Sequence, residues 1–141
     1  MLKLPAAIYT QILGHCLGGL PDEACGLIAG DGEGQVSVCY PTTNAAASAK
    51  LYTVDPLEHL RAERDAESLG LEIIGVFHSH THTDAYPSPT DVEQASTPLS
   101  NPQWHYVLVS LRDTHPTLRS YRIVDGQIDE ESVVVESHVA G

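Results

Sequence analysis

The pattern of apolar and polar residues along the chain predicts helices that alternate with strands. Apolar residues recur at helical spacing between residues 8 and 17, and Gly18-Gly19 marks the end of that helix. A compact apolar run at 24–29 predicts a buried strand. Residues 35–40 alternate between apolar and polar after a glycine-rich turn, so the two segments are expected to pair as a hairpin.

The pattern continues through the second half of the chain. Residues 51–54 predict a short strand, and Asp55 is a candidate N-cap for a helix that runs to about Ser68. The segment 71–77 is apolar at successive positions, which is typical of a central strand covered on both faces. Three more strands are expected, after a short helix that Ser88 would cap, at residues 104–111, 118–124 and 133–135. The predicted class is therefore mixed α and β, with a sheet flanked by helices.

The length and composition fit one domain, expected to span residues 1–141. The chain has 19 acidic and 7 basic residues and a net charge of -12, which argues against nucleic acid or an anionic membrane as a partner. Its three cysteines are widely spaced and predict no disulfide framework. With no apparent signal peptide and no long apolar run, these features predict a cytoplasmic protein, while the oligomeric state stays open.

The residues that carry chemistry are concentrated between His78 and Asp91. His78 and His80 follow the predicted central strand at spacing i, i+2, so both imidazoles point the same way on an extended chain. Asp91 comes eleven residues later, in the first turn of the predicted short helix. Two imidazoles and a carboxylate suit one zinc ion and leave a fourth position for water. The sequence therefore predicts one Zn²⁺ per chain, bound by these three side chains.

A hydrolytic zinc site also needs a group that moves protons. Glu23 is the preferred candidate for this acid/base, because it precedes the buried strand and burial would raise the pKa of its carboxyl group. Asp22 is the competing carboxylate, and strand alternation would turn it away from Glu23. Ser88 is a candidate hydrogen-bond donor to an oxyanion, and it has a second interpretation as a plain helix N-cap.

These residues resemble the signature of the JAMM (MPN+) metalloproteases, which is H-x-H, seven residues, then S-x-x-D, with an upstream glutamate. The resemblance implies that His78, His80 and Asp91 bind zinc, that Glu23 is the acid/base and that Ser88 steadies the tetrahedral intermediate. It also implies a cytidine-deaminase-like sandwich around a curved mixed sheet.

Longer segments in and around the motif residues resemble the small bacterial members of the Mec type; they lie at 21–26, 85–88, 104–110 and 119–126. Those enzymes hydrolyse the bond after the C-terminal Gly-Gly tail of a ubiquitin-like sulfur-carrier protein and release cysteine. The carrier is therefore the predicted partner, with its tail along an exposed strand edge. Two alternatives stay open: an isopeptidase that removes ubiquitin-like modifiers from proteins, and a non-catalytic MPN scaffold.

Other reactive side chains have structural interpretations. His82 continues the alternation of the two histidines, but it is expected to line the cleft rather than to bind metal. Asp84 is interpreted as a solvated loop carboxylate. Cys25 is interpreted as a small buried strand residue, since no base stands at the spacing known from cysteine proteases. His105 is assigned no role.

Overall fold

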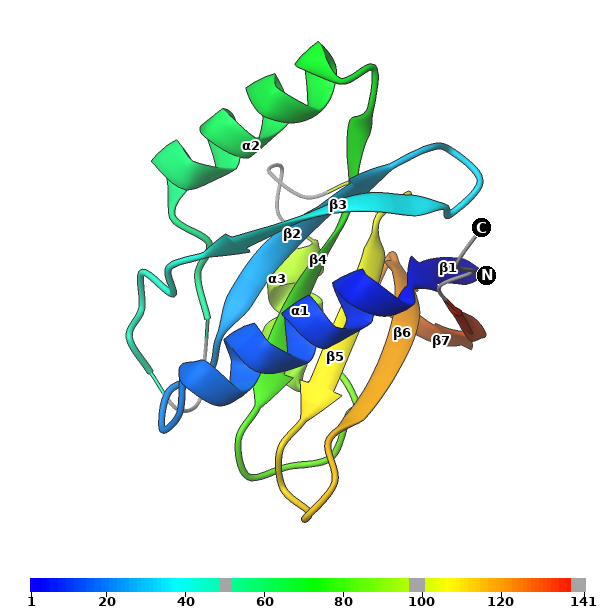
Figure 1. The fold of residues 1–141 in the computed structure, drawn as a ribbon. Helices are drawn as coiled ribbons and strands as arrows, with labels where there is room; N and C mark the ends of the chain where they lie inside the picture. The colour runs from blue at the N-terminus through cyan, green and yellow to red at the C-terminus, as the bar shows by residue number, and fades with distance from the viewer. Residues whose placement is uncertain (49–51, 97–100, 138–141) are drawn as a thin grey trace.

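A six-stranded mixed sheet forms the centre of the protein, in a computed structural model that describes residues 1–48, 52–96 and 101–137 (Figure 1). The strand order is β3-β2-β4-β5-β6-β7, and β1 pairs with β8 as a separate parallel ribbon. The strands are β1 Leu2–Pro5, β2 Cys25–Gly30, β3 Val36–Thr42, β4 Glu72–His80, β5 His105–Ser110, β6 Thr117–Val124, β7 Gln127–Glu131 and β8 Val133–Glu136.

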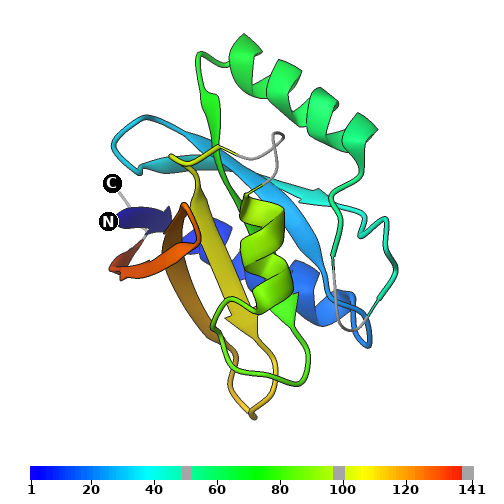
Figure 2. The ribbon, with the colours of Figure 1, turned by 180° about the vertical axis from the view of Figure 1, so that it is seen from behind.

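The three helices of the described residues cover the two faces of this sheet. Helix α1 (Ala6–Gly18) crosses one face, and α3 (Pro89–Ala95) lies on the opposite face (Figures 1 and 2). Helix α2 (Pro56–Ser68) shares the face of α3, where its buried Ala62 joins the side chains of β2 and β4. None of these helices combines the length and apolar character needed to cross a bilayer.

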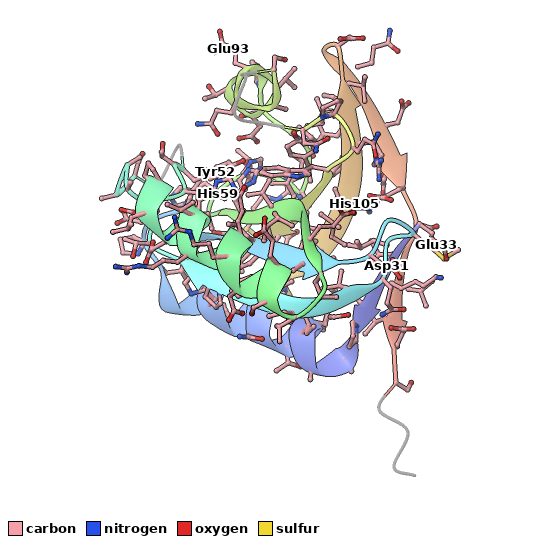
Figure 3. All side chains as sticks on the ribbon, turned by 90° about the horizontal axis from the view of Figure 1, so that it is seen from above. Asp31, Glu33, Tyr52, His59, Glu93 and His105 are labelled. Carbon is pink, nitrogen blue, oxygen red and sulfur yellow. The ribbon has the colours of Figure 1, made fainter. Side chains whose placement is uncertain are left out.

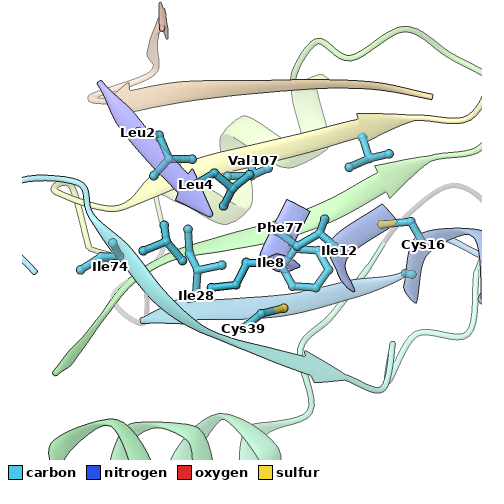
Figure 4. Close-up of a cluster of buried hydrophobic side chains, with 13 residues drawn as sticks. Leu2, Leu4, Ile8, Ile12, Cys16, Ile28, Cys39, Ile74, Phe77 and Val107 are labelled. Carbon is cyan, nitrogen blue, oxygen red and sulfur yellow. The ribbon is translucent and has the colours of Figure 1, made fainter. Parts of the chain in front are cut away.

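Each face of the sheet has its own apolar core. The core under α1 contains Leu2, Leu4, Ile8, Ile12, Ile28 and Phe77 among its buried side chains (Figure 4). Phe77 lies so close to β2 that a Cβ atom on Gly26 would come within 2.3 Å of its ring, so only glycine fits there. The core on the other face includes Cys25, Leu27, Tyr52, Val76 and Leu108. It continues toward His78 and His80, which are the last buried side chains of β4 on that face.

Most of the elements expected from the sequence are confirmed. The three helices, the hairpin β2–β3 and the strands β4, β5, β6 and β8 occur close to their predicted positions. Strand β4 is central as expected, antiparallel to β2 and parallel to β5.

Two short strands were not predicted, and one predicted strand is wrong. β1 is a strand of four residues directly before a helix, and β7 is a polar edge strand, so neither carries a clear apolar alternation. In the segment predicted at 51–54, Leu51 lies outside the described residues. The rest is not a strand, since Val54 makes only an isolated bridge with Asn44.

A buried polar network joins β5, β6 and β7. It includes His105, for which the sequence suggested no role. Glu131 accepts hydrogen bonds from His105 Nδ1 at 2.6 Å and from Ser120 Oγ at 2.8 Å. Arg122 Nη1 lies 3.1 Å from Nε2 of the same imidazole, and Figure 3 shows His105 among the strands at this end of the sheet. Burial opposes ionisation of Glu131, but the hydrogen bonds outweigh it and lower its pKa to about 2.

The substitution Glu131→Gln is expected to lower the free energy of unfolding at pH 7 by about 2 kcal/mol. A carboxylate with a depressed pKa stabilises the fold fully above pH 4.5, its ordinary pKa, and this contribution is lost as the pH falls toward 2. Urea denaturation of both proteins at pH 7 and at pH 3 measures the effect, and the gap between them should narrow at pH 3. Equal free energies of unfolding for the wild type and Glu131→Gln at pH 7 would contradict a stabilising role of the Glu131 carboxylate. Glu130→Gln is the matched control, because Glu130 pairs with Arg119 on the exposed surface.

Candidate metal centre

His78, His80 and Asp91 bring three potential ligand atoms together at the end of β4. His78 and His80 lie on the same face of the strand, and the first turn of α3 places Asp91 above them. His80 Nε2 is 2.9 Å and His78 Nε2 is 3.2 Å from Asp91 Oδ2, and the two nitrogens are 3.3 Å apart. Ligand atoms of a tetrahedral zinc ion with bonds of about 2.0 Å lie about 3.3 Å from one another. The spacing of these atoms therefore fits one small cation.

The hydrogen bonds around His80 support the same interpretation. Nδ1 of His80 lies 2.8 Å from the carbonyl oxygen of Asp84, which can only accept a hydrogen bond. A neutral His80 therefore carries its proton on Nδ1, and the lone pair of Nε2 faces a carboxylate oxygen 2.9 Å away. Two lone pairs at this distance repel each other unless a proton or a metal ion lies between them. The donor set is thus that of a metal site with an oriented histidine ligand.

The pKa values of His78, His80 and Asp91 depend on one another. Burial lowers the pKa of His78 below its ordinary value, which keeps its imidazole neutral as a ligand must be. Burial would also lower the pKa of His80, but its hydrogen bonds to Asp91 and to the Asp84 carbonyl raise it. Burial alone would raise the pKa of Asp91, yet hydrogen bonds with both histidines hold it well below its usual range. The carboxylate is therefore charged, buried and ready to bind a cation.

The loop between β4 and α3 is fixed by contacts with the neighbouring strands. Ser110 Oγ on β5 donates to the carbonyl of Thr83 at 2.6 Å, and the Tyr121 hydroxyl on β6 donates to the carbonyl of Ala85. Asp84 lies between these two anchors and accepts from His80. The loop therefore orients His80 through the backbone, with little reliance on the side chain of Asp84, which is exposed.

Ser88 and Asp91 form a capping box at the start of α3. Ser88 Oγ accepts from the backbone N–H of Asp91 at 3.1 Å, and Asp91 Oδ2 accepts from the backbone N–H of Ser88 at 2.9 Å. The N-cap interpretation of Ser88 is confirmed. Its hydroxyl hydrogen is not used by the cap, so it can still be donated to another group.

Glu23 lies beside the ligand cluster because of the register of the sheet. Cys25 pairs with His78, and Ala24 and Ser79 exchange hydrogen bonds, so Glu23 comes opposite His80 and on the same face. Its side chain is only 5% exposed, and Oε1 has no hydrogen-bond partner among the described residues. Burial raises the pKa of Glu23 to about 7, as the sequence suggested.

The remaining sequence candidates lie outside the cluster. His82 is exposed and, in the part of the chain that the structure describes, is not grouped with the ligand atoms. Cys25 is fully buried in β2, and burial raises the pKa of its thiol to about 11, which does not suit a nucleophile. Tyr52 was missed altogether: its ring stacks on His78, and no local pattern in the sequence points to this contact.

The sequence matches the family described as prokaryotic homologs of the JAB domain over residues 5–124. The chain belongs to this family. It is 43% identical to the CysO-cysteine peptidase of Mycobacterium tuberculosis (strain ATCC 25618 / H37Rv), covering 98% of this chain and 94% of that protein. It is 38% identical to a desampylase of Haloferax volcanii over 69% of this chain and 74% of the relative.

The fold expected from the JAMM resemblance is also confirmed, since the crystal structure of AF2198, a JAB1/MPN domain protein from Archaeoglobus fulgidus, superimposes with a TM-score of 0.60 at 19% identity, covering 94% of this chain and 97% of that one. A Desulfitobacterium hafniense protein whose structure was solved in solution superimposes with a TM-score of 0.88, at 33% identity, covering 99% of this chain and 96% of that one. This JAB-family chain thus has the curved mixed sheet with flanking helices that the sequence suggested.

The three cysteines of this JAB-family protein should not react with thiol reagents in the folded state. Cys16, Cys25 and Cys39 are all buried, and burial raises the pKa of their thiols to about 12, 11 and 12. Titration with Ellman's reagent at pH 8 should detect almost no thiol in the native protein and all three after denaturation in guanidinium. Rapid labelling of Cys25 in the native protein would contradict this prediction and would support Cys25 as a nucleophile.

Proposed function

We propose that this protein is a zinc-dependent peptidase that hydrolyses the amide after the C-terminal glycine of a ubiquitin-like sulfur-carrier protein and releases cysteine. The observation that carries the proposal is the buried group of His78, His80 and Asp91 with Glu23 beside it. The relative named CysO-cysteine peptidase, which matches almost the whole chain, supports this choice of substrate.

Each residue of the site has a separate task in this reaction. His78, His80 and Asp91 would hold the zinc ion, which when bound polarises the scissile carbonyl and acidifies the attacking water. Glu23 takes a proton from that water through its unpartnered carboxylate oxygen and later gives it to the leaving amine. Its raised pKa, near 7, suits a group that must both accept and release a proton. Ser88 donates its free hydroxyl hydrogen to the developing oxyanion.

A groove next to Glu23 suits an extended substrate tail. It has a volume of about 450 Å³ and is lined by Glu23, Ala24, the end of β3 at Pro41 and Thr42, and the next two residues, Thr43 and Asn44. Strand β3 is the edge of the six-stranded sheet, so its outer backbone groups can pair with an added strand. The glycine tail of the carrier would lie along this edge, with the scissile amide at Glu23.

The proposal extends to the location of the protein and to its domain organisation. Cys16, Cys25 and Cys39 form no disulfide, which supports a reducing, cytoplasmic location. Strand β8 pairs with β1 and so joins the last described strand to the first, which supports one domain over residues 1–141.

A second candidate is an isopeptidase that removes ubiquitin-like modifiers from lysine side chains, and the similarity to the Haloferax volcanii desampylase favours it. The two functions differ in what leaves: a free amino acid, or a folded protein attached through lysine. Purified zinc-loaded protein should be incubated separately with a carrier–cysteine adduct and with a carrier–lysine isopeptide. Mass spectrometry of the products should show faster release of cysteine, and cleavage of the isopeptide alone would favour the second candidate.

The substitution Glu23→Gln is expected to lower kcat by about 10²- to 10⁴-fold, because an amide cannot move the proton of the attacking water. Zinc content should stay at one equivalent, since Glu23 is not in the ligand group. Asp22→Asn is the matched control, because it removes the adjacent carboxylate from the same groove. Full activity of Glu23→Gln would refute the acid/base assignment, whereas zinc-loaded wild type that hydrolyses neither substrate would fit the scaffold alternative.

The substitution Asp91→Ala is expected to weaken zinc binding by at least about 100-fold, because one of three protein ligands is lost. Metal analysis after dialysis against a weak chelator measures this. Asp84→Ala should keep its zinc, because His80 uses the backbone carbonyl of Asp84 and the side chain is exposed. One full zinc equivalent in Asp91→Ala would count decisively against the proposed ligands.

A further inference from the structure

We propose that Tyr52 is the positioning residue for His78, and that the face of its ring takes the place of a hydrogen bond to the imidazole. The two rings are stacked, with centroids 4.0 Å apart and planes inclined by 21°. Tyr52 is 6% exposed and lies on the same side of the sheet as α3 (Figure 3). The inference rests on the proposed zinc site and adds a residue that the metal motif does not contain.

The two histidines differ in what holds their second ring nitrogen. A histidine that binds a metal through one nitrogen almost always donates a hydrogen bond from the other, which fixes the ring. His80 does so through Nδ1 to the carbonyl of Asp84 at 2.8 Å. His78 Nδ1 is buried and has no hydrogen-bond partner among the described residues. The orientation of His78 therefore depends on another contact.

Stacking on Tyr52 can supply this orientation. The nearly parallel rings are in van der Waals contact, so rotation of the imidazole about its Cβ–Cγ bond would drive its edge into the tyrosine face. The stack thereby keeps Nε2 directed at Asp91, 3.2 Å away. The contact uses the ring face of Tyr52 and does not require its hydroxyl group.

Hydrogen bonds connect the segment of Tyr52 to two elements that carry site residues. Gln94 on α3 donates through Nε2 to the carbonyl of Tyr52 at 2.9 Å. The next residue, Thr53, donates its N–H to Asn44 Oδ1 at 2.9 Å, and Asn44 Nδ2 donates to the carbonyl of Glu23 at 2.8 Å. The stacking tyrosine is therefore connected to the helix of Asp91 and to the backbone of the proposed acid/base.

Variants at position 52 separate the ring face from the hydroxyl group. Tyr52→Phe keeps the stack and should bind zinc within about twofold of the wild type, whereas Tyr52→Met fills the space without a ring and should bind about tenfold more weakly. Tyr106→Met is the control, because Tyr106 is buried to a similar degree in the same core, and among the described residues the histidine stacked on a tyrosine in this core is the one on Tyr52. Zinc dissociation constants come from competition with a chromophoric chelator, and the visible spectrum of the Co²⁺-loaded proteins reports ligand geometry.

The outcomes distinguish this inference from the proposed function. Wild-type protein that binds no zinc would refute both. Zinc binding by wild type with an unchanged dissociation constant and Co²⁺ spectrum in Tyr52→Met would refute the positioning role alone, as would equal losses in Tyr52→Phe and Tyr52→Met. Nitrogen-15 NMR of the zinc-loaded wild type tests the role without a substitution: the Nδ1 proton of His78 should lack the downfield hydrogen-bond shift that His80 shows, and a strong shift for His78 would overturn the proposal.

Discussion

The pairing of β2 with β4 in one register determines where the chemistry of this protein can take place. Cys25 opposite His78 brings Glu23 opposite His80, so the proposed base and two proposed ligands share one face of the sheet. A shift by one residue would turn Glu23 to the other face, into the core under α1. Ser79 secures this register at the critical point, because its backbone N–H and its Oγ both bond to Ala24. The parallel pairing of β4 with β5 then anchors the loop that orients His80.

This arrangement places groups in the interior that are unfavourable there by themselves. Asp91 is a buried carboxylate, Nε2 of His80 lies 2.9 Å from it and needs a proton or a cation between them, and Glu23 has a buried oxygen without a hydrogen bond in the described structure. A cation among the three ligand atoms would take the place of the protons that otherwise join them, and water beside it would satisfy Glu23. Unfavourable local features that cluster at one point and are resolved by one bound ion are typical of a functional site rather than of a structural core.

The sequence predicted the parts of the site that lie within short segments and missed those that depend on contacts across the fold. The i, i+2 spacing of His78 and His80 and the cap at Ser88 are local, so the spacing alone placed them correctly. Tyr52 reaches His78 only because α3 and Asn44 hold its segment, and the sequence there suggested a strand instead. The network around Glu131 was missed for the same reason, because its members come from three strands. The short strands β1 and β7 carry too few apolar positions to be recognised.

X-ray absorption at the zinc K-edge tests the central claim most directly, since it reports the atoms around the metal in the intact protein. Two imidazoles, one carboxylate and one water predict nitrogen and oxygen scatterers at about 2.0–2.1 Å, together with the multiple scattering that imidazole rings produce. Loss of one imidazole contribution in His78→Ala would complete the assignment. A sulfur scatterer at about 2.3 Å would show that a cysteine binds the metal. A shell of six oxygens would show zinc held only at the acidic surface, and either result would contradict the account.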